Sequence, residues 1–318
     1  MIKHVICIFL LDEDNQTFSQ SYDLNFPEDA VPDSERAFVD VTGIILGISI
    51  KNMNNLVNLP TGCGEQNLVH FTPNYLILDF LSSIGKLNDD IKSIAIQNLY
   101  TGYQREFNFR HYDGSFSAFG ETDKTGSMFL TAFVLRSFSQ AKRYIFIDDN
   151  ALADMQTWIV ARQQKDGCFP NIGQIFDSRI QGGLAGEKNS GAITAYVVTS
   201  LLISKYDNQT VIEKAFSCLN KNPPSSPYEI FLYAYTKALA GDNEAAQKLI
   251  DDIKPRVNST DGIEYYKNPN GTQAINVETA AYAILANLQL GSNASDVLPL
   301  ARYLAMKLNS LGGFYSTQ

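Results

Sequence analysis

The sequence predicts a mainly α-helical fold in which helical hairpins repeat along most of the chain, after a short N-terminal β segment. Three observations predict it. Apolar residues recur at three- and four-residue spacing in the long segments after about residue 64, as is typical of helices. A turn containing an aromatic residue recurs at multiples of about 50 residues. Residues 1–50 instead contain short runs of β-branched and aromatic residues.

The first 50 residues are expected to form strands. Residues 2–10 are a short apolar run typical of a buried strand, in which Cys7 is a core thiol. Two further runs, SQSYDLNF and RAFVDVTGIILGISI, are separated by PEDAVPDSE, whose prolines and acidic residues indicate a turn. The N-terminal run is a poor match to a signal peptide, because acidic residues follow it without a small-residue cleavage site.

The remainder of the chain is expected to be helical. The predicted helices lie at 64–86, 89–110, 126–145, 148–164, 190–205, 209–221, 227–241, 244–254, 276–290 and 295–310. The aromatic residues Phe116, Phe169, Tyr265 and Phe314 of the intervening turns are 53, 96 and 49 residues apart. These separations correspond to one, two and one helical hairpins.

Hairpins of this kind bury their apolar faces only by stacking on one another. A closed ring of six hairpins, the α/α toroid, is one solution, and an open solenoid is the other. Five hairpins can be counted, and the chain stops where a sixth would begin. We therefore expect either an open array or a toroid that lacks its last hairpin.

Composition excludes several classes of function. The formal net charge of −9 argues against broad binding to nucleic acids or to anionic membranes, since both need a basic surface. The sequence has no apolar stretch long enough to span a bilayer. N-glycosylation sequons favour a secreted protein, and without a signal peptide the chain is expected to be part of a longer precursor. The sequons begin at Asn15, Asn208, Asn258, Asn270 and Asn293.

The stretch PTGCGEQN, residues 60–67, places the thiol of Cys63 three residues before the carboxamide of Gln66. One interpretation is structural: Cys63 is a buried thiol at the start of a helix, and Gln66 is a polar residue of its first turn. The other is chemical. The Cys63 sulfur attacks the Gln66 carbonyl, ammonia leaves, and an internal thioester remains as a stored electrophile.

Local features favour the chemical interpretation. Gly62 and Gly64 allow backbone conformations that bring the two side chains together, and Pro60 stiffens the entry to the turn. Glu65 completes the motif between the two reacting residues. A helix N-terminus stabilises the thiolate, which is the attacking species, and its N–H groups can polarise the carbonyl.

The segment LPTGCGEQNLVHFTPNYLILDFL closely resembles the thioester segment of the alpha-2-macroglobulin and complement superfamily, which includes insect thioester-containing proteins. The resemblance continues through GYQREFNFRHYDGSFSAFG, FLTAFVLRSFSQAKRYIFID, WIVARQQKDGCF, IQGGL, NVETAAYAILANLQL and GGFYSTQ. It implies an α/α toroid of six hairpins inserted in a CUB-type β domain. Residues 1–42 are then a partial CUB-type segment, and residues 43–318 are a thioester domain without its last hairpin.

The resemblance also implies which nucleophile the thioester accepts. In complement-like members a histidine, on a loop before a Gly-Gly pair, takes the acyl group from the glutamine, which makes hydroxyls good acceptors. Matching QIFDSRIQGGL to that loop places Asp177 at the position of the histidine. A carboxylate is a poor acyl carrier, so direct attack by amines is implied. Alternatively, Asp177 only caps a turn, where Arg179 could pair with it.

The resemblance to alpha-2-macroglobulin further implies a disulfide between Cys168 and Cys218, which spacing alone could not assign. His70, four residues after Gln66, is expected to be structural, because the family's histidine does not lie there. His111 is interpreted as a packing or turn residue, and His4 lies in the β segment. The Cys and His spacing does not suggest a metal site, and no cofactor is expected.

Two functions use this electrophile, and each consumes it in one reaction, so neither is enzymatic. An opsonin of innate immunity would attach to amines or hydroxyls of a microbial surface, whereas an endopeptidase inhibitor would trap the attacking protease through its lysines. Both need the remaining domains of the parent protein as partners. A third hypothesis is that the thioester never forms in this chain. A toroid enzyme is disfavoured, because the Asp pairs in LNDDI, IDDN and LIDDIK lie at hairpin ends without a further spaced Asp.

Overall fold

The structure is a computed structural model that describes residues 21, 56–177, 180–184, 190–269, 271–308 and 314. The predicted β segment, 1–42, lies outside these residues apart from Ser21. Because nearly all of the predicted helices fall within the described part, the structure tests the helical prediction.

Helices account for most of the described chain. The α-helices are α2 (Gly64–Ser83), α3 (Asp89–Glu106), α4 (Met128–Ala141), α5 (Asp149–Val160), α6 (Ser190–Ile203), α7 (Gln209–Lys221), α8 (Pro227–Leu239), α9 (Asn243–Ile253), α10 (Gln273–Gln289) and α11 (Ala294–Met306). Short 3-10 helices lie at Phe107–Phe109, Gly120–Thr122, Gly182–Leu184 and Lys254–Arg256, and the strands are β1 (Asn258–Thr260) and β2 (Ile263–Tyr265). The prediction of a mainly α-helical fold is confirmed.

Polar side chains mark where many of these helices begin. Asn88, Ser127, Asn208 and Thr272 are N-cap residues of α3, α4, α7 and α10, and each accepts a hydrogen bond from a backbone N–H of the first turn. Most helices end earlier than their apolar periodicity predicts. Gly85 follows α2 with a positive φ of 64°, a conformation that does not continue a helix.

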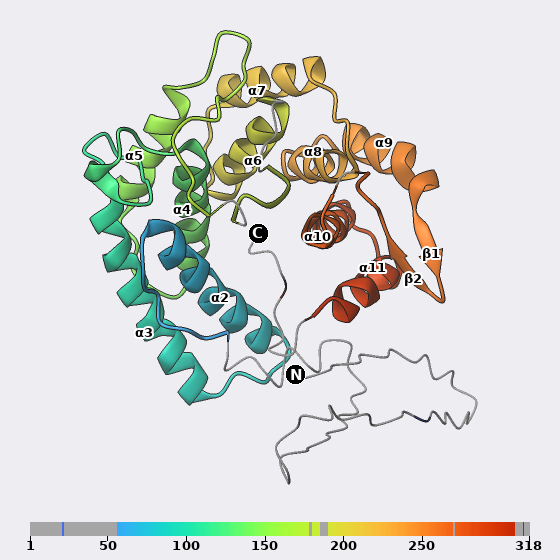
Figure 1. Ribbon diagram of the computed structural model, residues 1–318, viewed down its shortest axis with the longest axis horizontal. Helices are drawn as coiled ribbons and strands as arrows, with labels where there is room; N and C mark the ends of the chain where they lie inside the picture. Colours follow the sequence, from blue (N-terminus) through green and yellow to red (C-terminus); the bar gives the residue numbers. More distant parts are fainter. Residues whose placement is uncertain are drawn as a thin grey trace, which may run out of the picture.

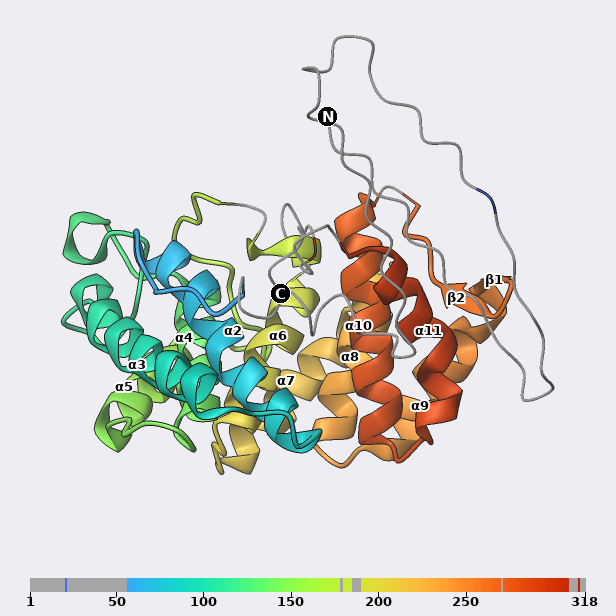
Figure 2. The same ribbon diagram turned by 90° about the horizontal axis from the view of Figure 1, so that it is seen from below.

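Consecutive helices pair as hairpins, and the hairpins are arranged in a ring (Figure 1). Each even-numbered helix packs against the odd-numbered helix that follows it, and α2, α4, α6, α8 and α10 also pack in succession along the inner side. From the side, α8, α10 and α11 stand next to one another, with β2 against α11 (Figure 2). The described ring therefore runs from the hairpin α2–α3 to the hairpin α10–α11.

The inner position of a helix determines how much of it is buried. In α6, the consecutive residues 191–201 are all buried, because neighbouring helices enclose this helix. The outer helix α7 is amphipathic instead, with Val211, Ile212 and Leu219 among its buried residues. One apolar cluster extends from α2 to α11. This continuous core fixes the position of α2, which carries the candidate site.

The turn DGIEYYKN differs from the expected simple connection between helices. Here β1 and β2 form an antiparallel hairpin in which Asn258 pairs with Tyr265 and Thr260 with Ile263. Asp261 and Gly262 form its tip and have positive φ values of 51° and 70°. An Asp-Gly pair with two positive φ angles is a favoured two-residue hairpin turn, so local turn chemistry explains the strands.

Candidate functional site

The turn before α2 brings the Gln66 carboxamide back to the residue that precedes Cys63. Cys63 is the N-cap residue of α2, with φ −76° and ψ 177°, and its carbonyl accepts a hydrogen bond from Asn67 N at 2.8 Å. Gly62 has a positive φ of 86°. A Cβ atom on Gly62 would lie 2.1 Å from Gln66 Oε1 and 3.0 Å from Gln66 Cδ, so the carboxamide folds over this glycine. The carbonyl carbon of the predicted ring is thus held at the turn that carries Cys63.

The chemical environment of this turn suits a nucleophile. Cys63 is a free, partly exposed thiol, and Gln66 is exposed. The N-terminus of α2 carries a partial positive charge, which stabilises an oxyanion that develops on the Gln66 carbonyl.

Two neighbouring segments contact the glycines of the motif. Gly64 N donates to Ala118 O at 2.9 Å, and a Cβ atom on Gly64 would lie 2.8 Å from Ser117 O. On the other side, Arg105 of α3 donates to Gly62 O from Nη2 at 2.6 Å and from Nε at 3.2 Å. The turn is therefore fixed from outside by α3 and by the loop that precedes α4.

Below the turn, α2 packs closely on α3. A Cβ atom on Gly102 would lie 2.7 Å from Pro60 Cγ, so Pro60 is in close contact with the α3 backbone. Asn67 Nδ2 donates to Gly102 O at 2.9 Å and to Glu106 Oε2 at 2.6 Å. Glu106 is fully buried, and this burial raises the pKa of its carboxyl well above its usual range.

Glu65 connects the motif to the loop of Asp177. Its side chain is only 1% exposed, and Oε1 accepts a hydrogen bond from Phe176 N at 2.8 Å while Oε2 accepts one from Asp177 N at 2.9 Å. Burial raises the pKa of Glu65, and the negative charges of Asp177 and Asp123 add to this effect, against the lowering effect of the two backbone bonds. The backbone of Asp177 thereby lies beside the turn of Cys63 and Gln66.

Exposed aromatic rings lie on the two loops that contact the motif. The rings of Phe119 and Phe176 meet edge to face with centroids 5.0 Å apart, and they are 47% and 51% exposed. Phe119 directly follows the residue that binds Gly64 N, and Phe176 is one of the residues bound by Glu65. The ring contact therefore joins the loops on either side of the α2 N-terminus.

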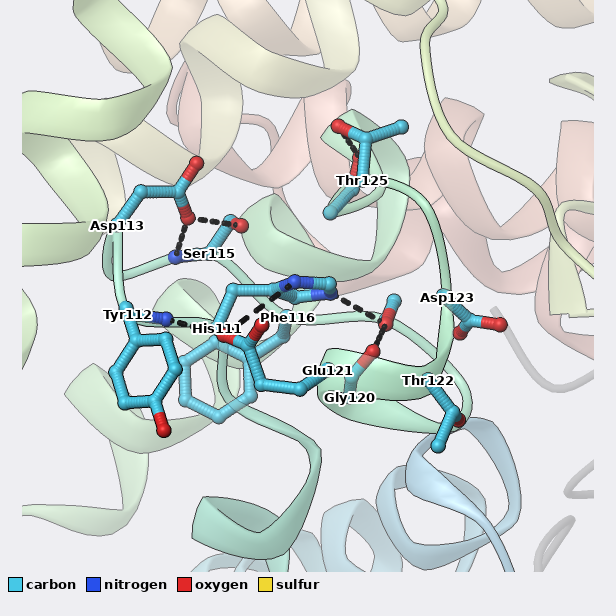
Figure 3. A network of polar contacts seen from close by, with 12 residues as sticks. His111, Tyr112, Asp113, Ser115, Phe116, Gly120, Glu121, Thr122, Asp123 and Thr125 are labelled. Atoms are coloured by element: carbon cyan, nitrogen blue, oxygen red, sulfur yellow. Dashed lines mark hydrogen bonds and ion pairs between the residues drawn. The ribbon is translucent and has the colours of Figure 1, made fainter.

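A polar network stiffens the loop that holds Gly64 (Figure 3). His111 is buried and its Nε2 lies 2.7 Å from Ser117 Oγ, which also donates to Gly120 O at 3.2 Å. Glu121 Oε1 accepts from Tyr112 N at 2.6 Å and lies 3.8 Å from His111 Nδ1. The structure thus places His111 in a turn network behind the site.

His70 lies further along α2 than this turn. The backbone carbonyl of His70 accepts from Asn74 Nδ2 at 2.7 Å, and among the described residues its imidazole has no hydrogen bond. His4, Cys7 and Arg179 lie outside the described residues.

Cys168 and Cys218 form a disulfide, the pair that the family resemblance implied. Cys168 lies in the turn after α5 and Cys218 lies in the last turn of α7, and both are buried. The bond therefore joins two successive hairpins.

The sequons are described in part. Asn258 is exposed on β1, and Asn208 and Asn293 are exposed N-cap residues of α7 and α11. Asn15 and Asn270 lie outside the described residues. Within the part of the chain that the structure describes, no group of three His, Cys, Asp or Glu side chains could hold a metal ion, and no helix is long and apolar enough to cross a membrane.

Sequence reasoning missed Arg105 and Glu106, which support the motif from α3. They are 43 and 39 residues from their partners Gly62 and Asn67. The helical period could place both near the end of α3, but it could not show that this end meets the motif.

Comparison with known proteins shows the family of the chain. The model of the A-macroglobulin TED domain matches residues 37–318. Ovostatin of Gallus gallus is 33% identical over 329 aligned positions, which cover 98% of this chain and 22% of ovostatin. This chain thus spans less than a quarter of that relative's length. A family match over most of the chain, on a ring of helical hairpins with the GCGEQ turn at the first described helix, shows that the chain belongs to the alpha-macroglobulin family and carries its TED domain.

Proposed function

We propose that Cys63 and Gln66 form an internal thioester through which the domain acylates another molecule, amines in preference to hydroxyls. The observation that carries this proposal is the position of the Gln66 carboxamide, folded over Gly62 next to Cys63. No other residue type fits at Gly62 without displacing the carboxamide, because its Cβ would occupy the same space.

Formation of the ring needs only these two side chains. The Cys63 thiolate attacks Gln66 Cδ, and the tetrahedral intermediate expels ammonia after its nitrogen takes up the proton that the thiol lost. A carbon–sulfur bond forms and a carbon–nitrogen bond breaks. The partial positive charge at the N-terminus of α2 stabilises both the thiolate and the oxyanion.

The second reaction transfers the acyl group. An amine attacks Gln66 Cδ, the carbon–sulfur bond breaks, and the departing thiolate of Cys63 takes up the proton from the amine. The product is an amide bond between Gln66 and the target, with a free thiol at Cys63. Attack by water instead leaves a glutamate, so each molecule reacts once and the domain is a reagent, not an enzyme.

Asp177 supports the preference for amines. Its backbone N–H is bound by Glu65, one residue from Gln66, so its carboxylate belongs to the surroundings of the thioester. A carboxylate there does not form a useful acyl intermediate, and its negative charge disfavours a neighbouring thiolate base. Hydroxyl acceptors lose that assistance, whereas amines attack without it.

The biological role that we propose is covalent attachment of a secreted parent protein to microbial surface amines, as in innate immunity. The disulfide and the exposed sequon residues support an extracellular location. An endopeptidase inhibitor that traps proteases through their lysines is the alternative, and the amine preference leans toward it without deciding between the two. A fragment in which the ring does not form is the second alternative.

Intact mass tests the chemistry. We expect the deglycosylated protein to be lighter by one ammonia than its sequence and disulfide require, and methylamine to add to Gln66 while releasing one thiol at Cys63. A full mass with Cys63 already free would contradict the proposal for this chain.

A further inference from the structure

The Glu65 carboxylate binds two backbone N–H groups that are 111 and 112 residues away along the chain. Glu65 belongs to the first turn of α2, between Cys63 and Gln66, and the donors belong to the loop that carries Asp177. A first-turn acid usually stabilises the N-terminus of its own helix. Here each carboxylate oxygen instead accepts one N–H of a distant loop.

The geometry of this contact makes it strong. Both carboxylate oxygens accept a backbone N–H, at 2.8 and 2.9 Å, and such bonds are stronger when the carboxylate is ionised. The side chain is almost completely buried, so little water is available to replace a lost bond. The edge-to-face contact between Phe119 and Phe176 restrains the same loop from outside.

We propose that Glu65 is a positioning residue that sets the nucleophile selectivity of the thioester by holding the Asp177 loop against the motif. This inference rests on the proposed function. Glu65 touches neither the nucleophile nor the reacting carbon. It fixes the distance between residue 177 and Gln66, so that the side chain at residue 177 decides whether the acyl group can pass through that side chain to a hydroxyl.

Hydrogen exchange tests the contact itself. In Glu65→Gln, one of the two N–H groups faces the amide NH2 instead of an acceptor, so we expect exchange at Phe176 or at Asp177 to rise about 10- to 100-fold. Glu229→Gln is the matched control, because Glu229 is also buried and accepts from Ser225 N at 2.6 Å and Ser226 N at 3.1 Å, at the start of α8. If the protection of Phe176 and Asp177 is unchanged in Glu65→Gln, Glu65 does not hold the loop. If Glu229→Gln lowers the protection of Phe176 and Asp177 as much as Glu65→Gln does, the effect is not specific to Glu65.

A variant on the loop side covers the case in which Glu65→Gln does not fold. Phe176→Pro removes the N–H that binds Glu65 Oε1, and Phe176→Ala removes the ring but keeps the N–H. We expect increased exchange at Asp177 in Phe176→Pro beyond that in Phe176→Ala. Equal exchange at Asp177 in the two variants would contradict the proposal that Glu65 holds the loop through the Phe176 N–H.

Competition between methylamine and glycerol tests the selectivity. We expect Asp177→His to raise the glycerol share at least tenfold in the native background, and we expect this gain to disappear when Glu65→Gln is added. A merely structural Glu65 would lower both reactions together and keep their ratio. A full glycerol gain in the double variant would therefore overturn the positioning role.

The other failures can be told apart. If Asp177→His gains no glycerol reactivity although the protein loses ammonia, the assignment of residue 177 in the proposed function is wrong, and with it the selectivity role. If ammonia is never lost, both proposals fail for this chain. Hydrogen exchange then still reports whether Glu65 holds the loop.

Discussion

The N-termini of α2 and α8 are held in different ways. At α8, Ser226 Oγ accepts from Glu229 N at 3.2 Å, and Glu229 Oε2 accepts from Ser226 N at 3.1 Å, which completes a capping box. Ser225 donates to the same carboxylate oxygen from N at 2.6 Å and from Oγ at 2.7 Å. The start of α8 is thus stabilised by residues next to it in sequence.

The start of α2 lacks this local arrangement. Cys63 makes no side-chain cap bond, and Glu65 binds a distant loop. Contacts with other segments take the place of the cap. Arg105 of α3 donates a hydrogen bond to Gly62 O, and Ala118 O accepts one from Gly64 N. The difference is that α2 lacks local stabilisation, and its N-cap thiol makes no capping bond, as the proposed thioester requires.

Breaking the motif at its first glycine should have the largest effect. Gly62→Ala places a Cβ 2.1 Å from Gln66 Oε1 at a φ of 86°, so we expect ring formation to be abolished. Gly241→Ala, just after α8, is the control, since its φ is 84° and its Cβ would have no neighbour within 4 Å. Both variants carry the left-handed strain of about 1–2 kcal/mol, but only Gly62→Ala displaces the carboxamide.

Intact mass and thiol titration separate the two glycine variants. We expect the loss of ammonia in Gly241→Ala and not in Gly62→Ala. A methylamine adduct on Gly62→Ala at the native rate would show that the fold of Gln66 over Gly62 is not needed for the reaction.

Removing each N-cap side chain should affect stability at α8 and reactivity at α2. Ser226→Ala should lower the free energy of unfolding by about 1 kcal/mol, the usual cost of a lost cap, and leave methylamine incorporation unchanged. Cys63→Ala should abolish incorporation with little loss from capping, because Cys63 makes no cap bond. Urea unfolding of both variants measures this, best after methylamine treatment so that no ring contributes. Equal destabilisation by the two changes would mean that Cys63 is a cap after all.

The same comparison shows what the sequence could and could not predict. Ser226 and Glu229 are three residues apart, so a capping box can be read directly from the chain. Cys63 and Gln66 have the same spacing, and glycines on both sides of Cys63 made the thioester hypothesis possible. Local chemistry is readable because it depends on spacing along one helix.

The contacts from outside could not be predicted in this way. Glu65 meets Phe176 and Asp177 only because the ring of hairpins brings the loop before α6 onto α2. The loop's approach depends on how the hairpins pack, which apolar periodicity does not specify. The β1–β2 hairpin is different, since its Asp261–Gly262 turn is a local signal that helical periodicity obscured.

The helices α2 and α8 also differ in the buried carboxylate that supports each of them. Glu229 has several donors, whereas Glu106 beneath α2 has Asn67 as its donor, and among the described residues Glu106 Oε1 and Asn67 Oδ1 have no partner. Burial raises the pKa of Glu106, so the folded state binds a proton more tightly than the unfolded chain does. Its stabilising contribution is therefore full below the unfolded pKa and is lost as pH rises toward the folded pKa.

Glu106→Gln should remove this pH dependence, because a glutamine does not titrate and its NH2 can donate to an unpartnered oxygen. As pH rises from 5 to 8, we expect the free energy of unfolding of the native protein to fall relative to that of the variant. Glu213→Gln is the control for the loss of one carboxylate, since Glu213 is exposed on the outer helix α7. Parallel stability curves for Glu106→Gln and the native protein would mean that Glu106 is already ionised in the fold. In that case α2 would rest on a charged group.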